Sequence, residues 1–545
     1  MNKSIQFLLV LMMFLPLSLI AQITHGGTPY ALNKKLNQPQ MATIDNSELF
    51  FIDSSYTKEC SAMEFARFLE FETKLGDKNW SVNELENGDK LYRLGIYSPG
   101  ALSIALYLKE VYIPKGAELF VYNPGIEEYF GSYTFENNTD EGFFNTEMIS
   151  GDEIVIEYFE PKSVSGQGQM ELYEVMHAYK APFVISEKDF GDSGDCEVNV
   201  KCPEAWGKSH QRDAVIRLLI KSGNSGTWCT GTLVNNTRQD KTPYVLTADH
   251  CGKKSSTEDM LQWRFYFNYQ STTCENPENE PQHKTMIGCE LISASNNTGD
   301  LGSDFFLIKL KNDIPEDYNP YFIGWSREGS VSNNGYTIHH PQGDIKKISI
   351  YKTPIQSSNY DQGENPYPNG FWKVVWAETQ SGHGVTEPGS SGSPLFDSNG
   401  YLIGTLTGGK ASCSALDAPD YYGKFSIHWQ DNGAEEDEQL APWLDPDNTN
   451  QLKLGGVYLD IEEFENTAQN EITLVPNPAK DNIQLLFDEN ISHVQVDLLH
   501  INGSVIHTYF FSNSSSINIS TLPRGVYLLR IADAQKTYVQ KLIKE

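Results

Sequence analysis

The sequence predicts an all-β chain that folds as several separate β domains. Apolar residues come in short runs that alternate with small or polar neighbours, as Leu102, Ile104 and Leu106 do in GALSIALYLKEVYIPKGAELFVYNP. Glycine, proline and asparagine breaks bound most of these runs, which is typical of strands joined by tight turns. A length of 545 residues is too great for one hydrophobic core and indicates three or four domains.

Residues 1–21 have the layout of a secretory signal peptide. Lys3 precedes an apolar stretch from Phe7 to Ile20, and the small residue Ala21 follows it. The stretch is too short for a membrane span, and a buried N-terminal strand is the alternative. Because no later stretch is long and apolar enough to cross a bilayer, we expect no transmembrane segment and an exported protein.

Residues 22–190 are expected to form a β-sandwich-like region. Short strands with frequent turns favour a sandwich, and no catalytic constellation is visible in this part of the chain. Its one cysteine is Cys60.

Residues 191–455 form a second region with a different composition. It is rich in glycine turns, cysteines and short apolar strands such as DAVIRLLI and DFFLIKL. In an exported protein these cysteines are expected to form disulfides. The sequence has no CxxC pair and no Cys/His cluster at zinc spacing, so we predict neither a metal site nor a cofactor.

The charge balance is strongly acidic. The chain has 72 Asp and Glu residues against 41 Lys and Arg residues, a formal net charge of −31. This excess argues against nucleic acids and anionic membrane surfaces as partners, and most of it is expected to be solvated surface charge.

The polar segment DIEEFENTAQN indicates a linker, which we assign to residues 456–470. Residues 471–545 follow it as a small β unit, expected to be a sandwich.

Three residue types used in nucleophilic catalysis occur in order in the central region. His250 follows the strand YVLTAD, and Asp304 opens the apolar strand DFFLIKL, where a charge needs a partner. Ser391 lies in EPGSSGSPLFD, where several small residues directly precede a predicted buried strand. Small residues allow the backbone to approach a substrate closely. A serine hydroxyl becomes a strong nucleophile when a histidine removes its proton and a carboxylate fixes the histidine tautomer.

These stretches resemble known enzyme motifs. TADHC, DFFLI and GSSGSP resemble the three catalytic boxes of trypsin-like serine proteases, and residues 191–445 resemble the bacterial lysyl endopeptidases more closely. The resemblance implies a chymotrypsin-like double β-barrel. It also implies that His250 is the general base and acid, Asp304 its orienting carboxylate and Ser391 the nucleophile. The backbone amides of Gly389 and Ser391 would form the oxyanion hole.

Two departures from the trypsin pattern are informative. Ser390 stands where trypsin-like zymogens have an aspartate that pairs with a new N-terminus, so activation is expected to work by removal of a pro-segment, with Lys188 the nearest basic site for self-processing. Val385 stands where trypsin has its specificity acid. The resemblance to lysyl endopeptidases instead implies Asp420, in PDYYGKF, as the acid that binds the substrate cation. Asp417 and Glu387 are nearby acids that could compete for this role.

The resemblance also implies three disulfides, Cys196–Cys413, Cys202–Cys274 and Cys229–Cys251. It gives no partner to Cys60 and Cys289, which either pair with each other or stay free. The histidines His339 and His340 are interpreted as loop residues near the cleft, because no third ligand lies at metal spacing.

The C-terminal unit resembles the sorting domain of the type IX secretion system of Bacteroidetes, with VPNPAKDNI at its start and LPRGVYLLRI near its end. A carbohydrate-binding β module is the alternative. This resemblance implies the type IX secretion machinery as a partner and a location outside the cell, secreted or on its surface. The N-terminal β region then becomes a propeptide.

The sequence therefore predicts a secreted serine endopeptidase that cleaves protein and peptide substrates after lysine, with arginine left open. One alternative is the same fold with glutamyl or broad specificity. The other is a surface adhesion or binding protein with a decayed protease domain.

Overall fold

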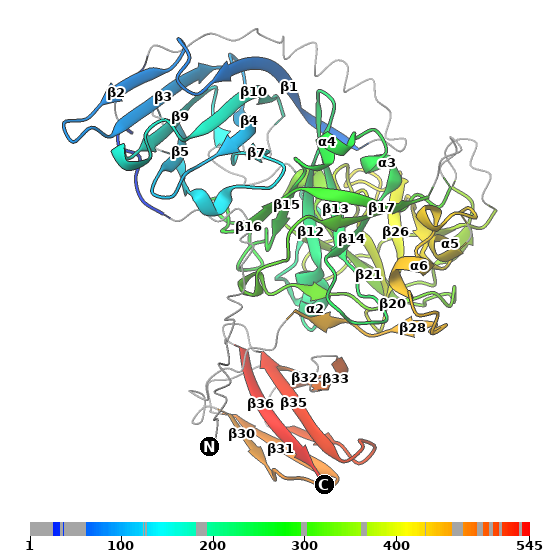
Figure 1. The fold of residues 1–545 in the computed structure, drawn as a ribbon. Helices are drawn as coiled ribbons and strands as arrows, with labels where there is room; N and C mark the ends of the chain where they lie inside the picture. Colours follow the sequence, from blue (N-terminus) through cyan, green and yellow to red (C-terminus); the bar gives the residue numbers. More distant parts are fainter. Residues whose placement is uncertain are drawn as a thin grey trace, which may run out of the picture.

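The computed structural model contains three β-rich regions. It describes residues 26–32, 36, 62–123, 125, 128–180, 193–295, 302–360, 368–430, 432–459, 472–487, 494–500, 505–511, 515–532 and 537–545. In Figure 1 the N-terminal region (62–180, blue to cyan) lies beside the central region (193–459, green to yellow), and the C-terminal region (472–545, orange to red) lies below it. The predicted signal peptide, Cys60 and Lys188 lie outside the described residues.

The N-terminal region is a sandwich of two sheets. One sheet has the order β2-β3-β9-β5-β6, and the other contains β1, β10, β4, β7 and β8. The strands are β1 (Met63–Lys74), β2 (Ser81–Glu84), β3 (Lys90–Tyr97), β4 (Ser103–Tyr112), β5 (Glu118–Asn123), β6 (Glu128–Tyr133), β7 (Phe144–Asn145), β8 (Ile149–Ser150), β9 (Glu153–Glu160) and β10 (Gln169–Ala178). Leu94 and Ile156 from the first sheet share one buried core with Ile104 and Leu106 from the second. Alternating apolar residues on facing strands therefore produce the expected sandwich.

The first sheet of the central region curls around its own core. Its strands are β12 (Val215–Ser222), β13 (Ser225–Leu233), β14 (Tyr244–Thr247), β15 (Arg264–Phe267), β16 (Lys284–Ile287), β17 (Cys289–Ala294) and β18 (Phe306–Leu310). Three short helices accompany them, α2 (Ser209–Ala214), α3 (Asp249–Gly252) and α4 (Thr257–Met260). Leu218, Val245 and Ile308 are fully buried inside this sheet.

The second sheet of the central region has a separate core that includes Trp372, Leu395 and Tyr422. Its strands are β11 (Val198–Asn199), β20 (Trp325–Ser326), β21 (Gly335–His339), β22 (Lys347–Tyr351), β23 (Gln356–Ser358), β24 (Phe371–Val374), β25 (Pro394–Asp397), β26 (Leu402–Gly409), β27 (Asp420–Lys424) and β28 (Lys453–Leu454). The helices α5 (Phe425–Gln430) and α6 (Ala441–Leu444) follow β27. A third core, to which Leu246 and Ile338 both contribute, joins the two sheets. The prediction of an all-β chain with a chymotrypsin-like double barrel is confirmed.

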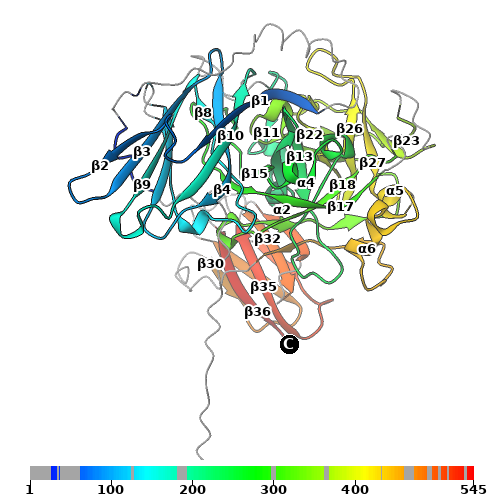
Figure 2. The ribbon, with the colours of Figure 1, turned by 45° about the horizontal axis from the view of Figure 1, so that its top comes forward.

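The N-terminal and central regions share one sheet, which the sequence analysis did not foresee. Strand β1 pairs with β10 on one side and with β13 of the central region on the other, where Met63 faces Trp228 and Arg67 faces Ser225. Twelve strands thus form one continuous sheet across the boundary (Figure 2). The ring of Phe65 stacks on that of Trp228 with their centroids 4.4 Å apart.

A buried ion pair reinforces this boundary. The Arg264 side chain is 1% exposed and pairs with the carboxylate of Glu147, and its Nε donates to Asn145 Oδ1 over 3.0 Å. Thr285 Oγ1 donates to the same Glu147 carboxylate. A buried guanidinium is tolerated only when its charge and donors are matched, so the two regions depend on each other here.

The C-terminal region is a small sandwich of two sheets, with the orders β30-β31-β34 and β33-β32-β35-β36. Its strands are β30 (Ile472–Val475), β31 (Asn482–Phe487), β32 (Val494–His500), β33 (Val505–Phe511), β34 (Ser515–Asn518), β35 (Gly525–Ala532) and β36 (Thr537–Lys544). The buried carboxylate of Asp497 accepts from Arg530 and lies 2.8 Å from His210 Nε2 of the central region.

Two residues of the predicted linker at 456–470 form β29 (Val457–Tyr458), which pairs with β19 (Tyr321–Phe322) of the central region. The predicted linker from residue 460 onward lies outside the described residues. The described part of the chain contains no helix with the length and apolar character of a membrane span.

We expect Glu147→Ala to destabilise the junction by about 3–5 kcal/mol, because it leaves the buried Arg264 charge without its counter-ion. Equilibrium unfolding in urea measures this as a lower midpoint. Glu110→Ala is the matched control, since Glu110 pairs with Lys74 in an exposed position, and should cost less than about 1 kcal/mol. Equal effects of the two substitutions would contradict the role given to the buried pair.

Candidate active site

Pairing of β14 with β18 brings His250 and Asp304 together. Thr247, the last residue of β14, faces Phe306, the first residue of β18, so the segments just beyond these ends meet. His250 Nδ1 lies 2.8 Å from Asp304 Oδ2, and the backbone N–H of His250 donates to Asp304 Oδ1 over 2.9 Å. Both side chains are almost completely buried. The carboxylate thus fixes the Nδ1–H tautomer and leaves Nε2 as the basic nitrogen.

Asp304 has an unusual backbone conformation, with φ of 61° in the left-handed region. Aspartate tolerates this region better than most residues, and a non-glycine residue there often marks a functional site. Ser303 supports the same turn, because its Oγ lies 2.7 Å from Nδ1 of the buried His428.

The segment that carries His250 is covalently anchored. The Cys229–Cys251 disulfide joins β13 to α3 with a Cα–Cα distance of 6.5 Å, and Cys251 Sγ lies 4.0 Å from His250 Nε2. Closing a loop of 22 residues stabilises the fold by roughly 3 kcal/mol in the chain-entropy model. The structure also contains the other two expected disulfides, Cys196–Cys413 and Cys202–Cys274.

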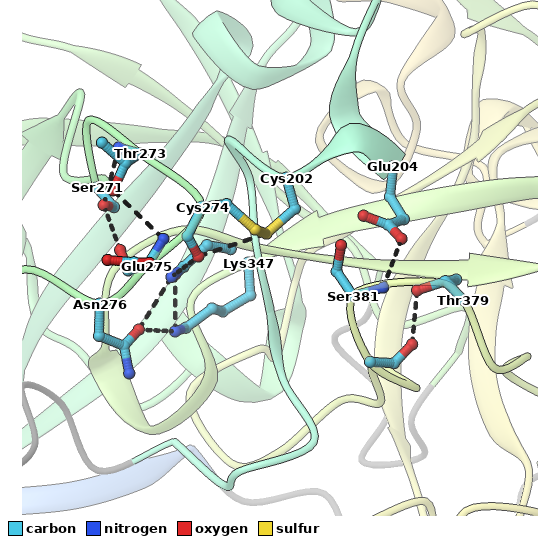
Figure 3. The surroundings of a disulfide bond; sticks show 12 residues. Cys202, Glu204, Ser271, Thr273, Cys274, Glu275, Asn276, Lys347, Thr379 and Ser381 are labelled. Atoms are coloured by element: carbon cyan, nitrogen blue, oxygen red, sulfur yellow. Dashed lines mark hydrogen bonds between the residues drawn. A yellow bond between two sulfur atoms is a disulfide. The ribbon is translucent and has the colours of Figure 1, made fainter.

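Figure 3 shows the surroundings of the Cys202–Cys274 disulfide. Asn199 donates to the carbonyl of Cys274, and the Nζ of Lys347 donates to Oδ1 of Asn276 over 3.1 Å. The disulfide therefore fastens the 271–276 loop to the second sheet beside Lys347.

Ser391 lies on a loop of residues 387–393, here called the Ser391 loop, which leads into β25. The loop is seated on the end of β14, because a Cβ atom at Gly392 would come within 2.1 Å of Thr247 Oγ1 and 2.8 Å of Ala248 N. The amide of Thr230 donates to the Ser391 carbonyl over 2.8 Å. These contacts bring the 9% exposed Ser391 to the strand end that carries His250.

Two amides of the Ser391 loop differ from their neighbours. The N–H groups of Ser390, Gly392 and Ser393 each donate to a backbone carbonyl. Within the described part of the chain, the N–H groups of Gly389 and Ser391 donate to no protein group. Two free amides beside a serine are the donors that an oxyanion hole requires.

Gly389 is required by its surroundings. Its φ is +94°, and a Cβ atom would come within 2.8 Å of Gly343 N and 2.9 Å of His340 O. The neighbouring turn also holds the loop, since Gln342 N donates to Pro388 O over 2.6 Å. Any larger residue would push the loop away from this turn.

Asp420 is the first residue of β27 and is 1% exposed. Its carboxylate accepts from Trp376 Nε1 over 2.7 Å, from Thr386 Oγ1 over 2.6 Å and from Ala411 N over 3.3 Å. Thr386 lies five residues before Ser391, so the acid sits beneath the chain that leads to the Ser391 loop. Trp376, Thr386 and Ala411 could not be found from the sequence, because only the folded chain brings them to Asp420.

The other three residues named in connection with this role, Val385, Glu387 and Asp417, lie in different surroundings. Val385 is fully buried in the core of the second sheet. Glu387 accepts from the Gly194 amide over 2.9 Å, which ties the start of the central region to the Ser391 loop. Asp417 is exposed.

The interpretation of His339 and His340 as loop residues is wrong for His339, which ends strand β21 beneath the Ser391 loop, whereas His340 lies in the segment after the strand. Both side chains are completely buried. Their burial could not be predicted from the dipeptide, because adjacent histidines before a proline are typical of an exposed turn. Cys289 is a buried thiol whose Sγ lies 3.5 Å from Met260 O, and it forms no disulfide with any described residue. In the described residues no three His, Cys, Asp or Glu side chains gather as metal ligands do.

Two parts of the chain are similar to known protein families. Residues 190–423 match the family model described as lysyl endopeptidase, C-terminal domain, and residues 473–545 match that described as secretion system C-terminal sorting domain. A lysyl endopeptidase of Pseudomonas aeruginosa is 28% identical over 296 residues, which cover 51% of this chain and 60% of the relative.

A secreted RxLR effector protein of Plasmopara viticola is 24% identical over 288 residues, covering 48% of this chain and 63% of the relative. The chain thus spans about three fifths of the length of both relatives. A crystal structure of the thermostable serine protease AL20 covers 39% of this chain, at 14% identity and a TM-score of 0.28.

The central region is thus similar to the lysyl endopeptidase C-terminal domain over residues 190–423, and residues 473–545 are similar to the secretion system C-terminal sorting domain.

Proposed function

We propose that the chain is an exported serine endopeptidase that hydrolyses peptide bonds after lysine. The observation that carries the proposal is the buried His250–Asp304 pair, against which the Ser391 loop is seated with two free amides. The match of residues 190–423 to the lysyl endopeptidase family supports the same reaction.

In the acylation step, His250 Nε2 removes the proton of Ser391 Oγ as this oxygen attacks the scissile carbonyl carbon. Asp304 stays ionised, holds the Nδ1–H tautomer and stabilises the imidazolium that forms. The amides of Gly389 and Ser391 donate to the oxyanion of the tetrahedral intermediate, where each donor contributes about 3–4 kcal/mol. The intermediate collapses when His250 gives the proton to the leaving amine and the C–N bond breaks.

Deacylation repeats the sequence with water as the nucleophile. His250 takes a proton from the water that attacks the acyl carbon, and then returns it to Ser391 Oγ as the ester bond breaks. The carboxylic acid product leaves and the enzyme regains its starting state. The same three side chains therefore act in both halves of the reaction.

Asp420 is the residue we assign to lysine selection. Its carboxylate accepts from the indole of Trp376, the hydroxyl of Thr386 and the Ala411 amide, which hold it in one orientation. A buried carboxylate selects a cationic side chain, because charge pairing away from water is strong. Val385, whose side chain packs in the core, adds no charge to the pocket.

The sorting domain indicates export to the cell surface or the extracellular space. We assign the type IX secretion machinery as the partner that reads it, and the N-terminal region as a propeptide.

A test of the nucleophile is Ser391→Ala. It should lower kcat by roughly 10⁶-fold and abolish labelling by a serine-directed phosphonate, because no other group can form the acyl-enzyme. Ser390→Ala keeps Oγ of Ser391 and should still be labelled. Loss of labelling in Ser390→Ala but not in Ser391→Ala would move the nucleophile by one residue.

Asp420→Asn should lower kcat/KM for lysyl substrates by roughly 10²–10⁴-fold, because a substrate cation would then be buried without a counter-charge. Reaction of Ser391 with a small uncharged acylating agent should stay unchanged. Asp417→Asn is the matched control in an exposed position. A series of fluorogenic peptides that differ only in the residue before the cut measures both variants. Undiminished lysine preference in Asp420→Asn would place the specificity acid elsewhere.

Asp249, next to His250, predicts a pH-dependent stability. Burial, and then the charge of Asp304, raises its pKa from 3.8 to about 7. The folded state therefore holds this proton more tightly than the unfolded state, and stability falls as the pH rises from about 4 to 7. Asp249→Asn should be more stable than the unchanged protein above pH 7, by about 2–4 kcal/mol, with the difference vanishing near pH 4. Urea unfolding at pH 4, 6 and 8 checks this, and a pH-independent difference would contradict it.

A further inference from the structure

A chain of neutral hydrogen bonds lies beneath the Ser391 loop. His339 Nδ1 is 2.8 Å from Ser390 Oγ, and His339 Nε2 is 3.1 Å from Ser349 Oγ. Ser349 Oγ donates onward to the Val385 carbonyl over 2.7 Å. Ser390 is the residue directly before Ser391, and the three side chains Ser390, His339 and Ser349 are completely buried.

The direction of every bond in this chain can be assigned. Ser349 has one hydroxyl hydrogen, which goes to the Val385 carbonyl, so Ser349 Oγ must accept from His339 Nε2–H. A neutral imidazole carries one hydrogen, so His339 Nδ1 must accept from the hydroxyl of Ser390. Ser390 Oγ in turn accepts from the amide of Glu387 over 3.3 Å.

The imidazole is neutral for a physical reason. Burial, together with the nearby charge of Lys347, lowers the pKa of His339 to about 3. The carboxylate of Glu197 lies 3.7 Å from His339 Nε2, farther than Ser349. Burial and the charge of Glu387 raise the pKa of Glu197 well above its usual range, which favours its neutral form.

The strand pairing explains why His339 reaches the loop. Strand β21 pairs with β25, the strand that the Ser391 loop enters, and with β22, which carries Ser349. His339 is the last residue of β21 and so lies under the loop itself. The conformation it supports is the one in which the Ser390 amide is bonded while those of Gly389 and Ser391 are free.

We propose that His339 is a positioning residue, which through Ser390 holds the Ser391 loop in the conformation that presents the Gly389 and Ser391 amides to an oxyanion. This rests on the proposed function. The bond chain stands where trypsin-like zymogens have an aspartate that pairs with a new N-terminus, and it uses only residues 339–391. These hydrogen bonds are therefore all present in the uncleaved polypeptide and do not require proteolysis.

The first test is the kinetics of the full-length chain on a small lysyl ester. His339→Ala and Ser390→Ala should each lower kcat by roughly 10²-fold while KM stays within about three-fold, because the loop loses its alignment and not its substrate pocket. The double variant should be no slower than the slower single one, since both break the same chain. Unchanged kcat per folded molecule in His339→Ala would overturn the proposal.

Two further variants separate positioning from general stability. His339→Asn offers an oxygen near the position of Nδ1 to accept from Ser390, and should recover at least about ten-fold of the lost kcat. His177→Ala is the matched control, because His177 is also completely buried and its Nδ1 lies 2.8 Å from a serine hydroxyl, that of Ser98, in the N-terminal region. It should lower the unfolding midpoint without changing kcat. An equal loss of kcat in His177→Ala would contradict the positioning role, because the effect of His339→Ala would then be explained by lower stability alone.

The last measurement does not depend on activity. Nitrogen-15 NMR of labelled histidines in the full chain should show His339 as the Nε2–H tautomer, with Nδ1 unprotonated, and Ser390→Ala should shift the Nδ1 resonance. An Nδ1–H tautomer would overturn the bond chain. Failure of the unchanged protein, tested both with and without its N-terminal region, to hydrolyse any lysyl ester or to react with a phosphonate at Ser391 would reject the proposed function. The tautomer of His339 would still show whether its Nδ1 accepts a hydrogen bond from Ser390.

Discussion

The buried carboxylate of Asp304 is the constraint on which the candidate site depends. An ionised carboxylate without solvent is costly unless hydrogen bonds satisfy its oxygens, and here both bonds come from His250, one from its backbone and one from its ring. The fold cannot keep Asp304 inside without also fixing the orientation and tautomer of the imidazole. The same requirement explains why the β14–β18 pairing and the Cys229–Cys251 disulfide converge on this point.

Near this pair, neutral hydrogen-bonding groups hold two further side chains. The hydroxyl groups of Ser390 and Ser349 flank His339, and an indole and a hydroxyl hold Asp420. Buried neutral groups need only hydrogen-bond partners, whereas each buried ion needs a counter-charge as well. The contacts with Ser390 and Ser349 therefore orient the ring of His339 while leaving it neutral.

Much of the site could be predicted from the sequence because its residues lie on short, recognisable motifs. His250, Asp304 and Ser391 each adjoin a strand with a clear apolar pattern, and the resemblance that they carry also implied all three disulfides. The surroundings of Asp420 could not be predicted, because Trp376 and Ala411 reach it through the pairing of β24, β26 and β27, and Thr386 reaches it from the segment before the Ser391 loop.

The burial of His339 was missed for a related reason. Two adjacent histidines before a proline resemble a surface turn, and only the position of β21 between β22 and β25 shows that they are internal. The sheet that the N-terminal and central regions share could not be predicted either. Strands β1 and β13 are separated by about 150 residues, and an apolar strand pattern does not state which edge a strand will join.

The two flanking regions contact the central region through interfaces that do not rely on the connecting chain. At one, β1 adds to the edge of β13 and Glu147 matches the buried Arg264 charge; at the other, Asp497 lies against His210. Cutting the polypeptide between regions breaks none of these bonds. Separating them would expose an unpaired sheet edge at β13 and leave the Arg264 guanidinium without its carboxylate, both of which are unfavourable. Cleavage alone is therefore insufficient for release, and removal of the N-terminal region must also overcome the free energy of this shared sheet.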